Sequence, residues 1–326
     1  MQNDTLVDVK NVSRWYGATC AVNNVSFQVN RGEVLGFLGP NGAGKSTTMN
    51  MITGNLAPTS GEIIIAGVDI LDDPQAAKRH IGFLPEQPPL YMAFTVNEYL
   101  RFCAKLNGIV NTKIQSAIDS AKQRCGLTQV GDRLIGNLSK GFQQRVGIAQ
   151  AIIHNPTVVI LDEPTVGLDP NQIGEIRQLI RDLGEEHSVI LSSHILPEIQ
   201  STCDRVQIIN QGELVFHSSM DKLEESRPID NLLVAFDKPP LAKELENLHQ
   251  VNDVELTDTH HFKIFFDPEN NPTETIVQAS VANHWALTEI TPLKKTLEQI
   301  FVEITSGDIP DKIDSKSDSD DGNRAV

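Results

Sequence analysis

The segment Gly39–Thr47, which reads GPNGAGKST, constrains the fold of this chain more than any other stretch. Gly39, Gly44, Lys45 and Ser46 satisfy the pattern G-x-x-x-x-G-K-[S/T]. Glycine lets the backbone curl so that its N–H groups point at phosphate oxygens. The lysine then supplies a positive charge to the β- and γ-phosphates, and the serine hydroxyl binds Mg²⁺. The segment therefore predicts a phosphate-binding loop for a nucleotide.

The residues around this loop fit a strand before it and a helix after it. The apolar run Val34–Gly39 comes first, and a helix-like stretch follows that Gly54 ends. An ordinary glycine turn would lack this context. We expect the nucleotide to contact the whole loop, which comprises Gly39, Pro40, Asn41, Gly42, Ala43, Gly44, Lys45, Ser46 and Thr47.

Strand-like and helix-like stretches alternate from the N-terminus to about Ser218. Residues 6–12, 22–29 and 61–67 read as short or half-buried strands. Three more continuously apolar runs predict buried parallel strands, at residues 34–39, 158–162 and 188–193. Helices fit between them, including one with capping-box spacing at Thr95 and Glu98 and one after Asp169. This alternation predicts an α/β fold with a mainly parallel sheet.

The pattern changes after Ser218. Residues 219–305 read as β-α-β-β-α-β, which predicts a small α+β domain of the ferredoxin-like type. A closing helix is expected over residues 292–305. Residues 306–326 carry many aspartates and few apolar side chains, so we expect a disordered acidic tail. The domain boundaries are thus 1–218, 219–305 and 306–326.

Two carboxylates follow the apolar run that ends at Asp162. In a parallel sheet this strand end lies beside the phosphate loop, so Asp162 would hold Mg²⁺ through water. Glu163 should point to the opposite face, where it could polarise an attacking water. His194 ends the next strand and is placed to contact a γ-phosphate. Alone, Asp-Glu is more often a strand terminus and a single histidine is usually structural, but the nearby phosphate loop favours function for all three.

A second anion site is predicted at Leu138–Arg145, which reads LSKGFQQR and opens a helix. Ser139 followed by Gly141 at a helix N-terminus suits phosphate binding, because free N–H groups and the helix dipole both favour an anion. One nucleotide needs only one such loop. The sequence therefore raises the question of which phosphate this second site binds.

With these pieces in order, residues 5–218 resemble the ATP-binding subunit of ABC transporters. The segment Leu138–Arg145 resembles the signature that distinguishes this family from other phosphate-loop NTPases. The resemblance implies a cassette with an antiparallel β subdomain and a helical subdomain. It also implies that Tyr16 stacks on adenine, that Ile81–Glu86 is the Q-loop, that Asp169 lies in the D-loop at a dimer seam, and that His194 is the switch histidine.

The resemblance implies an answer to the question of the second site. Two cassettes would pair head to tail, so that Ser139 and Gly141 of one chain hold the γ-phosphate bound by the other. Lys140 and Phe142 depart from the common Leu-Ser-Gly-Gly-Gln signature, although Ser139 and Gly141 are kept. Glu86 stands where the Q-loop usually has glutamine. It can ligate Mg²⁺, and whether Glu86 or Gln87 takes the Q-loop role is left open.

The branch that this chain most resembles energises ABC-2-type permeases, including gliding-motility, sodium-export and multidrug-type cassettes. We therefore expect an ATPase subunit of a bacterial exporter that uses ATP and Mg²⁺. It would form a homodimer on a separate integral-membrane permease, at the cytoplasmic face of the plasma membrane. The Q-loop and the helix from Thr95 to about Asn107 would receive the permease's coupling helix.

Composition and charge limit the rivals. The net charge of −16, without a Lys/Arg cluster, argues against nucleic acid as a partner and against a cassette acting on the ribosome or DNA. No run approaches the ~20 apolar residues of a membrane span, and the first residues do not read as a signal peptide. The four scattered cysteines suggest reduced thiols. A regulatory or scaffold protein with a degraded cassette is the other alternative, and intact Lys45, Asp162, Glu163 and His194 argue against it.

Overall fold

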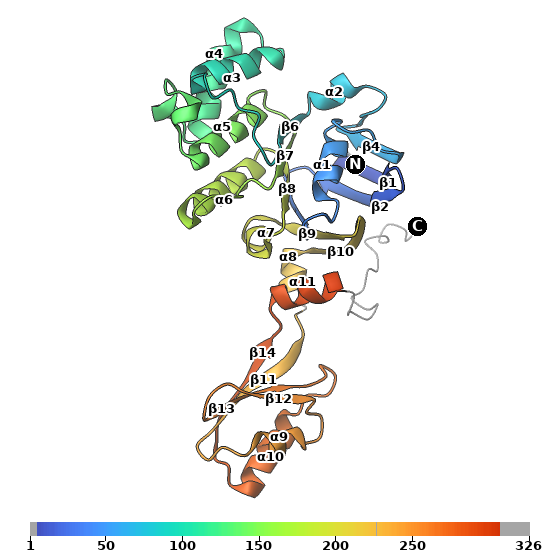
Figure 1. The fold of residues 1–326 in the computed structure, drawn as a ribbon, viewed down its shortest axis with the longest axis vertical. Helices are drawn as coiled ribbons and strands as arrows, with labels where there is room; N and C mark the ends of the chain where they lie inside the picture. Colours follow the sequence, from blue (N-terminus) through green and yellow to red (C-terminus); the bar gives the residue numbers. More distant parts are fainter. Residues whose placement is uncertain (1–4, 226, 307–326) are drawn as a thin grey trace, which may run out of the picture. The chain divides into compact units, whose positions relative to one another are not determined.

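The computed structural model describes residues 5–225 and 227–306. The chain divides into two compact units between Lys222 and Leu223 (Figure 1), slightly beyond the boundary expected at Ser218. The expected acidic tail lies outside the described residues, apart from its first residue. Among the described residues, no helix is both long and apolar enough to cross a bilayer.

A six-stranded sheet forms the centre of the first unit, in the order β10-β9-β3-β8-β7-β6. All neighbouring strands pair in parallel except β10, which runs antiparallel to β9. The expected buried parallel strands are confirmed, since every residue of β3 and β7 is buried. The strands are β3 (Val34–Leu38), β6 (Ile81–Leu84), β7 (Val158–Asp162), β8 (Ser188–Ser193), β9 (Arg205–Asn210) and β10 (Glu213–Ser219).

A separate antiparallel sheet, in the order β2-β1-β4-β5, covers α1 from the other side. Its inward side chains share one core with α1 and the central sheet, including Val9, Phe27, Phe37 and Met49. The phosphate loop and α1 are therefore held between two sheets (Figure 1). The elements are β1 (Thr5–Tyr16), β2 (Thr19–Asn30), α1 (Lys45–Ile52), β4 (Ser60–Ile65), β5 (Val68–Asp69) and α2 (Pro74–Lys78).

The remaining helices of this unit include a group formed by α3, α4 and α5 at one end (Figure 1). The expected capping box at the start of α3 is present, because Thr95 and Glu98 each accept a hydrogen bond from the other's backbone N–H. The helix expected after Asp169 is α6, and the Asp169 side chain caps it. The helices are α3 (Val96–Leu106), α4 (Asn111–Arg124), α5 (Lys140–Ile152), α6 (Pro170–Gly184) and α7 (Leu196–Thr202).

The register of the central sheet brings three strand ends to one edge. Leu38 pairs with Ser193, and Asp162 pairs with Ser192. The loops after β3, β7 and β8 therefore leave the sheet side by side. In open α/β sheets this carboxyl edge is where ligands bind.

The second unit confirms the expected β-α-β-β-α-β order. Its four antiparallel strands lie in the order β12-β13-β11-β14, and apolar side chains of α9 and α10 share its core. Leu232, Phe262 and Leu245 belong to that core. The elements are β11 (Ile229–Phe236), α9 (Ala242–Glu246), β12 (Asp253–Leu256), β13 (His261–Phe265), α10 (Thr273–Asn283) and β14 (Leu287–Lys294).

The closing helix begins later than expected. Residues 292–294 extend β14, and α11 runs from Leu297 to Ser306. The expected helix start at Pro292 is wrong, because Pro292 pairs opposite Leu232 in β14. A proline is tolerated there because β14 is an edge strand, whose outer side needs no backbone donor. The short helix α8 (Met220–Glu225), at the division between the units, was not expected from the sequence.

Candidate active site

The loop between β3 and α1 has the shape that phosphate binding requires. Gly44 has a φ of +107°, and a Cβ there would lie 2.7 Å from the carbonyl oxygen of Ala21. A Cβ on Gly39 would lie 2.4 Å from the carbonyl oxygen of Ile209. Only glycine fits either position. Because the first N–H groups of a helix have no partner within it, α1 offers unpaired donors and the positive end of its dipole to this loop.

A cavity of about 430 Å³ opens beside this loop. It brings together residues that the sequence placed at the ends of different strands. Its lining comprises Ala21, Asn41, Gly42, Gly44, Lys45, Ser46, Thr47, Glu86, Glu163, Val166 and His194. The phosphate loop, the Q-loop position, a carboxylate and a histidine therefore surround one space.

Lys45 is buried at the base of this cavity. Its Nζ atom donates to the carbonyl oxygens of Gly39 at 2.9 Å and Pro40 at 3.2 Å. The same atom lies 3.4 Å from Oε1 of Glu163. Three oxygens of its own chain thus surround the ammonium group.

Glu163 lies directly beyond strand β7, in an unusual backbone conformation. The strand ends at Asp162, and Glu163 has a φ of +49°, a region that side-chain-bearing residues seldom enter. Its carboxylate is thereby directed to Lys45 on one side and to His194 on the other, with 2.9 Å between Oε2 and Nδ1 of His194. Backbone outliers of this kind concentrate at functional sites, so this conformation supports a role for Glu163.

Ser192 holds the two carboxylate residues in place from β8. Its hydroxyl donates to Oδ1 of Asp162 and accepts the backbone N–H of Glu163 at 3.2 Å. Asp162 is buried and is not among the residues that line the cavity. Asp162 therefore does not border the cavity directly, and its expected contact with Mg²⁺ through water stays a prediction.

The oxygen ligands near the phosphate loop are few, but they suit Mg²⁺. Among the described residues, no group of three or more His, Cys, Asp or Glu side chains is gathered as metal ligands. Mg²⁺ is usually bound by one or two protein oxygens together with substrate phosphates and waters. The Ser46 hydroxyl and the Glu86 carboxylate, both at the cavity, suit that mode.

The signature residues lie elsewhere. Ser139 caps α5 and accepts the N–H of Phe142 at 3.4 Å. With Gly141 it lines a second cavity of about 260 Å³, which shares no lining residue with the cavity beside Lys45. The other residues of that lining are Gly126, Phe142, Arg145, Gln172, Glu175 and Ile176. Within one chain, the signature and the phosphate loop therefore face different spaces.

Lys140, which departs from the usual signature, extends toward the D-loop. A Cβ on Gly167 would lie 2.0 Å from its Nζ atom, so the amine rests directly over this glycine. Asp169, two residues later, is exposed and accepts the N–H of Gln172 at 2.9 Å as the cap of α6. The signature and the D-loop are thus neighbours in the fold.

Comparison with known proteins decides the family. The sequence model described as ABC transporter matches residues 22–166. The bacitracin transport ATP-binding protein BcrA of Bacillus licheniformis is 33% identical over 93% of this chain and 98% of its own. The linearmycin resistance ATP-binding protein LnrL of Bacillus subtilis (strain 168) is 31% identical over 94% of this chain and 100% of its own.

The chain belongs to the ABC transporter family. It is an ATP-binding subunit of such a transporter and an ATPase. Its fold matches that of the cassette MJ0796, solved as a dimer in a post-hydrolysis state with ADP and Pi. That match has a TM-score of 0.60 and 26% identity, and it covers 66% of this chain and 99% of the other.

The ABC cassette also contains residues that sequence reasoning missed. Ala21 and Val166 line the nucleotide cavity. Neither carries a polar group, so no chemical signal marks them. Ser192 joins two carboxylate residues, but a serine near the end of a strand gives no sign of this before the register is known.

Tyr16 is one of several expected ABC site residues that lie outside the cavity beside Lys45, together with Asp162, Ser139 and Asp169. It is 49% exposed. The guanidinium of Arg14 lies 4.8 Å from the centre of its ring. One face of the ring is therefore covered by a cation.

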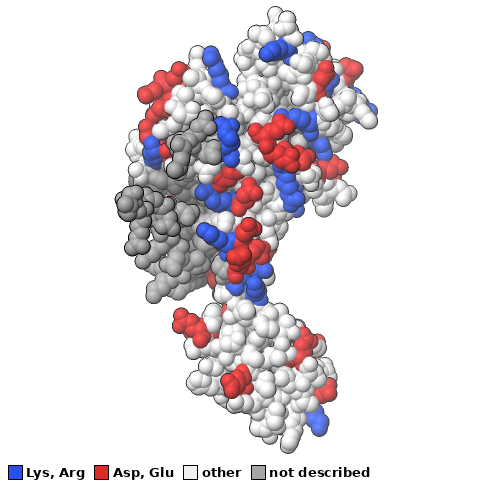
Figure 2. Space-filling view, turned by 180° about the vertical axis from the view of Figure 1, so that it is seen from behind, with Lys and Arg blue, Asp and Glu red and all other residues white. Residues whose placement is uncertain are grey.

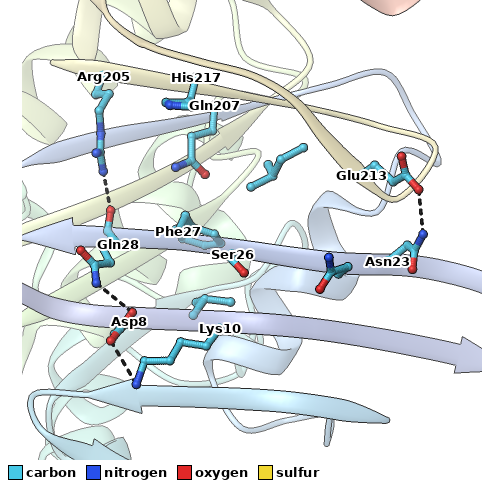
Figure 3. A pocket seen from close by; sticks show the side chains of 13 residues that line it. Asp8, Lys10, Asn23, Ser26, Phe27, Gln28, Arg205, Gln207, Glu213 and His217 are labelled. Atoms are coloured by element: carbon cyan, nitrogen blue, oxygen red, sulfur yellow. Dashed lines mark hydrogen bonds and ion pairs between the residues drawn. The ribbon is translucent and has the colours of Figure 1, made fainter. Parts of the chain in front are cut away.

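A larger hollow of about 890 Å³ lies between β2 and β10 of the cassette (Figure 3). Its charged groups are paired with one another or with nearby polar groups. Asp8 contacts Lys10 and Gln28, Arg205 donates to the carbonyl oxygen of Gln28, and Glu213 accepts from Asn23. On the face of the cassette in Figure 2, basic side chains are likewise interspersed with acidic ones.

Proposed function

We propose that this chain is the ATPase subunit of an ABC-2-type exporter, which pairs head to tail with a second copy and drives a separate permease. The observation that carries the proposal is the separation of the two cavities: Lys45 lines one, and Ser139 and Gly141 line the other. Two helix N-termini that line different cavities of one chain suit a pair in which each chain completes the other's site.

In the proposed site, the N–H groups of residues 39–47 cradle the phosphates, and Lys45 exchanges a contact with Glu163 for the β- and γ-phosphates. Tyr16 stacks on adenine with the face that Arg14 leaves open. Mg²⁺, when bound, neutralises charge on the phosphates. Ser46 and Glu86 would hold it directly, and Asp162 through water. Glu86 lines the cavity, whereas its exposed neighbour Gln87 does not. This difference favours Glu86 in the Q-loop role.

For hydrolysis, Glu163 would orient the attacking water and accept its proton. His194 contacts Oε2 of Glu163 at 2.9 Å, so the ring can hold the carboxylate while facing the γ-phosphate. Across the seam, the Ser139 hydroxyl and the Gly141 N–H would bind the γ-phosphate of the partner's nucleotide. Lys140 would bring the D-loop, and with it Asp169, to the same seam. Catalysis of this kind depends mainly on positioning and charge stabilisation.

An exposed aromatic cluster beside the Q-loop supports docking of a permease. The ring of Tyr91 lies 5.3 Å from that of Phe94 and 5.5 Å from that of Phe102. Tyr91 and Phe94 are 52% and 37% exposed, and Phe102 belongs to α3. Aromatic side chains are enriched in protein interfaces. A permease segment would bind here, and it would hold the subunit at the cytoplasmic face of the membrane.

The direction of transport rests on the relatives. The names of BcrA and LnrL refer to bacitracin transport and linearmycin resistance. Moving an antibiotic out of the cell protects it, so these names favour export.

A mixing experiment tests the paired arrangement. Lys45→Ala and Ser139→Arg should each abolish nucleotide trapping in a homodimer, because both sites lose an essential part. A mixed dimer should regain one competent site, which combines the phosphate loop of the Ser139→Arg chain with the signature of the Lys45→Ala chain. Trapping of nucleotide with a γ-phosphate mimic measures it. Mixed dimers that form, as shown by differently tagged chains, but trap no nucleotide would overturn the proposal.

A further inference from the structure

Glu198 is a buried carboxylate that the proposed mechanism does not use. It lies in the first turn of α7 and is 1% exposed. Its Oε1 accepts the hydroxyl of Thr165 at 2.7 Å, and its Oε2 accepts the hydroxyl of Ser193 at 2.9 Å. Burying a carboxylate is costly unless it is hydrogen-bonded, and here each oxygen has a partner.

The two partners flank the proposed catalytic residues. Thr165 stands two residues after Glu163, in the turn after β7. Ser193 is the last residue of β8 and directly precedes His194. The Ser193 hydroxyl also accepts the N–H of Ile195 at 3.0 Å. This hydrogen bond links the residue before His194 to the residue after it.

We propose that Glu198 is a positioning residue for ATP hydrolysis, which fixes the segment carrying Glu163 against the segment carrying His194. This inference rests on the roles proposed above for these two residues. Glu198 is not among the residues that line the nucleotide cavity, so it acts through Thr165 and Ser193. It adds a side-chain bridge between the turn after β7 and the end of β8, where the backbone N–H of Glu163 also donates to the carbonyl oxygen of Ser192 at 3.1 Å.

The strength and the geometry of these bonds support this role. Hydrogen bonds to an ionised carboxylate are about twice as strong as those between neutral groups. The base must lie within hydrogen-bond reach of the water, and a misplacement of about 1 Å can cost about 10²-fold in rate. A rigid bridge directly behind Glu163 and His194 limits such misplacement.

The first test compares Glu198→Ala with Glu198→Gln in the purified full-length protein. Glu198→Ala should lower kcat by about 10- to 100-fold, while the affinity for a fluorescent ATP analogue changes little. Glu198→Gln should recover most of the turnover, because its amide oxygen can accept the Ser193 hydroxyl and its N–H₂ can donate to the Thr165 oxygen. Asp182→Ala, an exposed acid on α6, is the matched control and should behave as wild type.

Single-arm variants guard against a folding defect in Glu198→Ala. Thr165→Val and Ser193→Ala each remove one hydroxyl, and each should lower kcat less than Glu198→Ala with the melting temperature nearly preserved. Glu198→Ala should also add little to Glu163→Gln in single-turnover hydrolysis, since it acts through the same carboxylate. If Glu198 were purely structural, Glu198→Ala would lower the single-turnover rate by the same factor in the wild-type protein and in Glu163→Gln.

The outcomes separate the two proposals. Normal turnover in Glu163→Gln would refute the assignment of the base and with it the mechanism. Loss of turnover in Glu163→Gln with normal kcat in both single-arm variants would overturn the role of Glu198 alone. An equal loss of ATP affinity and kcat in Glu198→Ala, without rescue by Glu198→Gln, would also overturn it.

Discussion

The Nζ atom of Lys45 lies 3.4 Å from Oε1 of Glu163, and both side chains are buried. The cation assigned to the phosphates and the carboxylate assigned to the water are therefore partners of each other in the protein. A phosphate that binds Lys45 competes with this carboxylate. In the proposed mechanism, binding of ATP would release Glu163 for its role as the base.

Glu163→Gln should lower ATP turnover by at least ~10²-fold, which is the usual scale of a general-base effect. ATP affinity should be kept or increased, because the amide no longer competes with phosphate for Lys45. Phosphate release and equilibrium binding of a fluorescent ATP analogue measure the two effects, and an ATP-bound dimer should accumulate in gel filtration.

The matched control for this variant is Glu62→Gln. Glu62 is a half-exposed glutamate that pairs with Lys10 at 2.9 Å, outside the nucleotide cavity. Its turnover should equal that of wild type. Near-normal turnover in Glu163→Gln, with this control also normal, would remove Glu163 from the mechanism.

Glu86 should be replaceable by glutamine with little loss of ATPase activity, because the amide oxygen can still ligate Mg²⁺. Glu86→Ala should weaken the stimulation of turnover by the permease in vesicles more than it weakens ATP binding. Gln87→Ala is the matched variant, and it should be silent because Gln87 is not among the residues that line the cavity. The reverse result, a damaging Gln87→Ala and a silent Glu86→Ala, would shift the Q-loop by one residue.

A buried histidine should make stability depend on pH. His187 accepts a hydrogen bond from Arg124 at Nε2 (2.8 Å), and its Nδ1 lies 2.6 Å from the carbonyl oxygen of Pro156. An arginine can only donate, so the ring is neutral and carries its proton on Nδ1. Burial lowers the pKa of His187 below its ordinary value of 6.5; the Pro156 contact opposes this shift and nearby Arg124 adds to it.

The lowered pKa of His187 determines how stability changes with pH. Below pH 6.5 the histidine of the unfolded chain binds a proton that the folded chain resists, so the free energy of unfolding falls as the pH falls. Urea unfolding between about pH 7.5 and 5.5 should show it. In His187→Gln the slope of the unfolding free energy against pH should be smaller, by the equivalent of up to about one proton taken up on unfolding. An identical dependence in wild type and His187→Gln would contradict the expectation.

Much of the site could be foreseen because its signals are local. The phosphate loop is one continuous motif, and Asp162 follows from the rule that parallel strands end at one edge. The backbone conformation of Glu163 could not be foreseen, because strand alternation does not reveal that the chain enters a positive φ of +49° directly after the strand. Pro292 was misread because the sequence does not show that its strand lies at a sheet edge.

Contacts between distant segments were the least accessible. Glu198 is five residues from Ser193 but 33 from Thr165, so its bridge exists only once β7 and β8 are aligned. The same holds for His187 and Arg124, which are 63 residues apart and join a helix end to the start of a strand. Such pairs follow from tertiary packing, for which a single sequence gives no spacing rule.

The separate cavities of the signature and the phosphate loop also bear on how activity scales. A solitary chain holds two halves that, in the proposed pair, belong to different nucleotide sites. By mass action, hydrolysis would then rise with the square of subunit concentration while pairs are scarce and linearly once they are abundant. A permease that holds two subunits side by side would remove this dependence. Assembly on the membrane would thus raise the ATPase activity per subunit to its maximum.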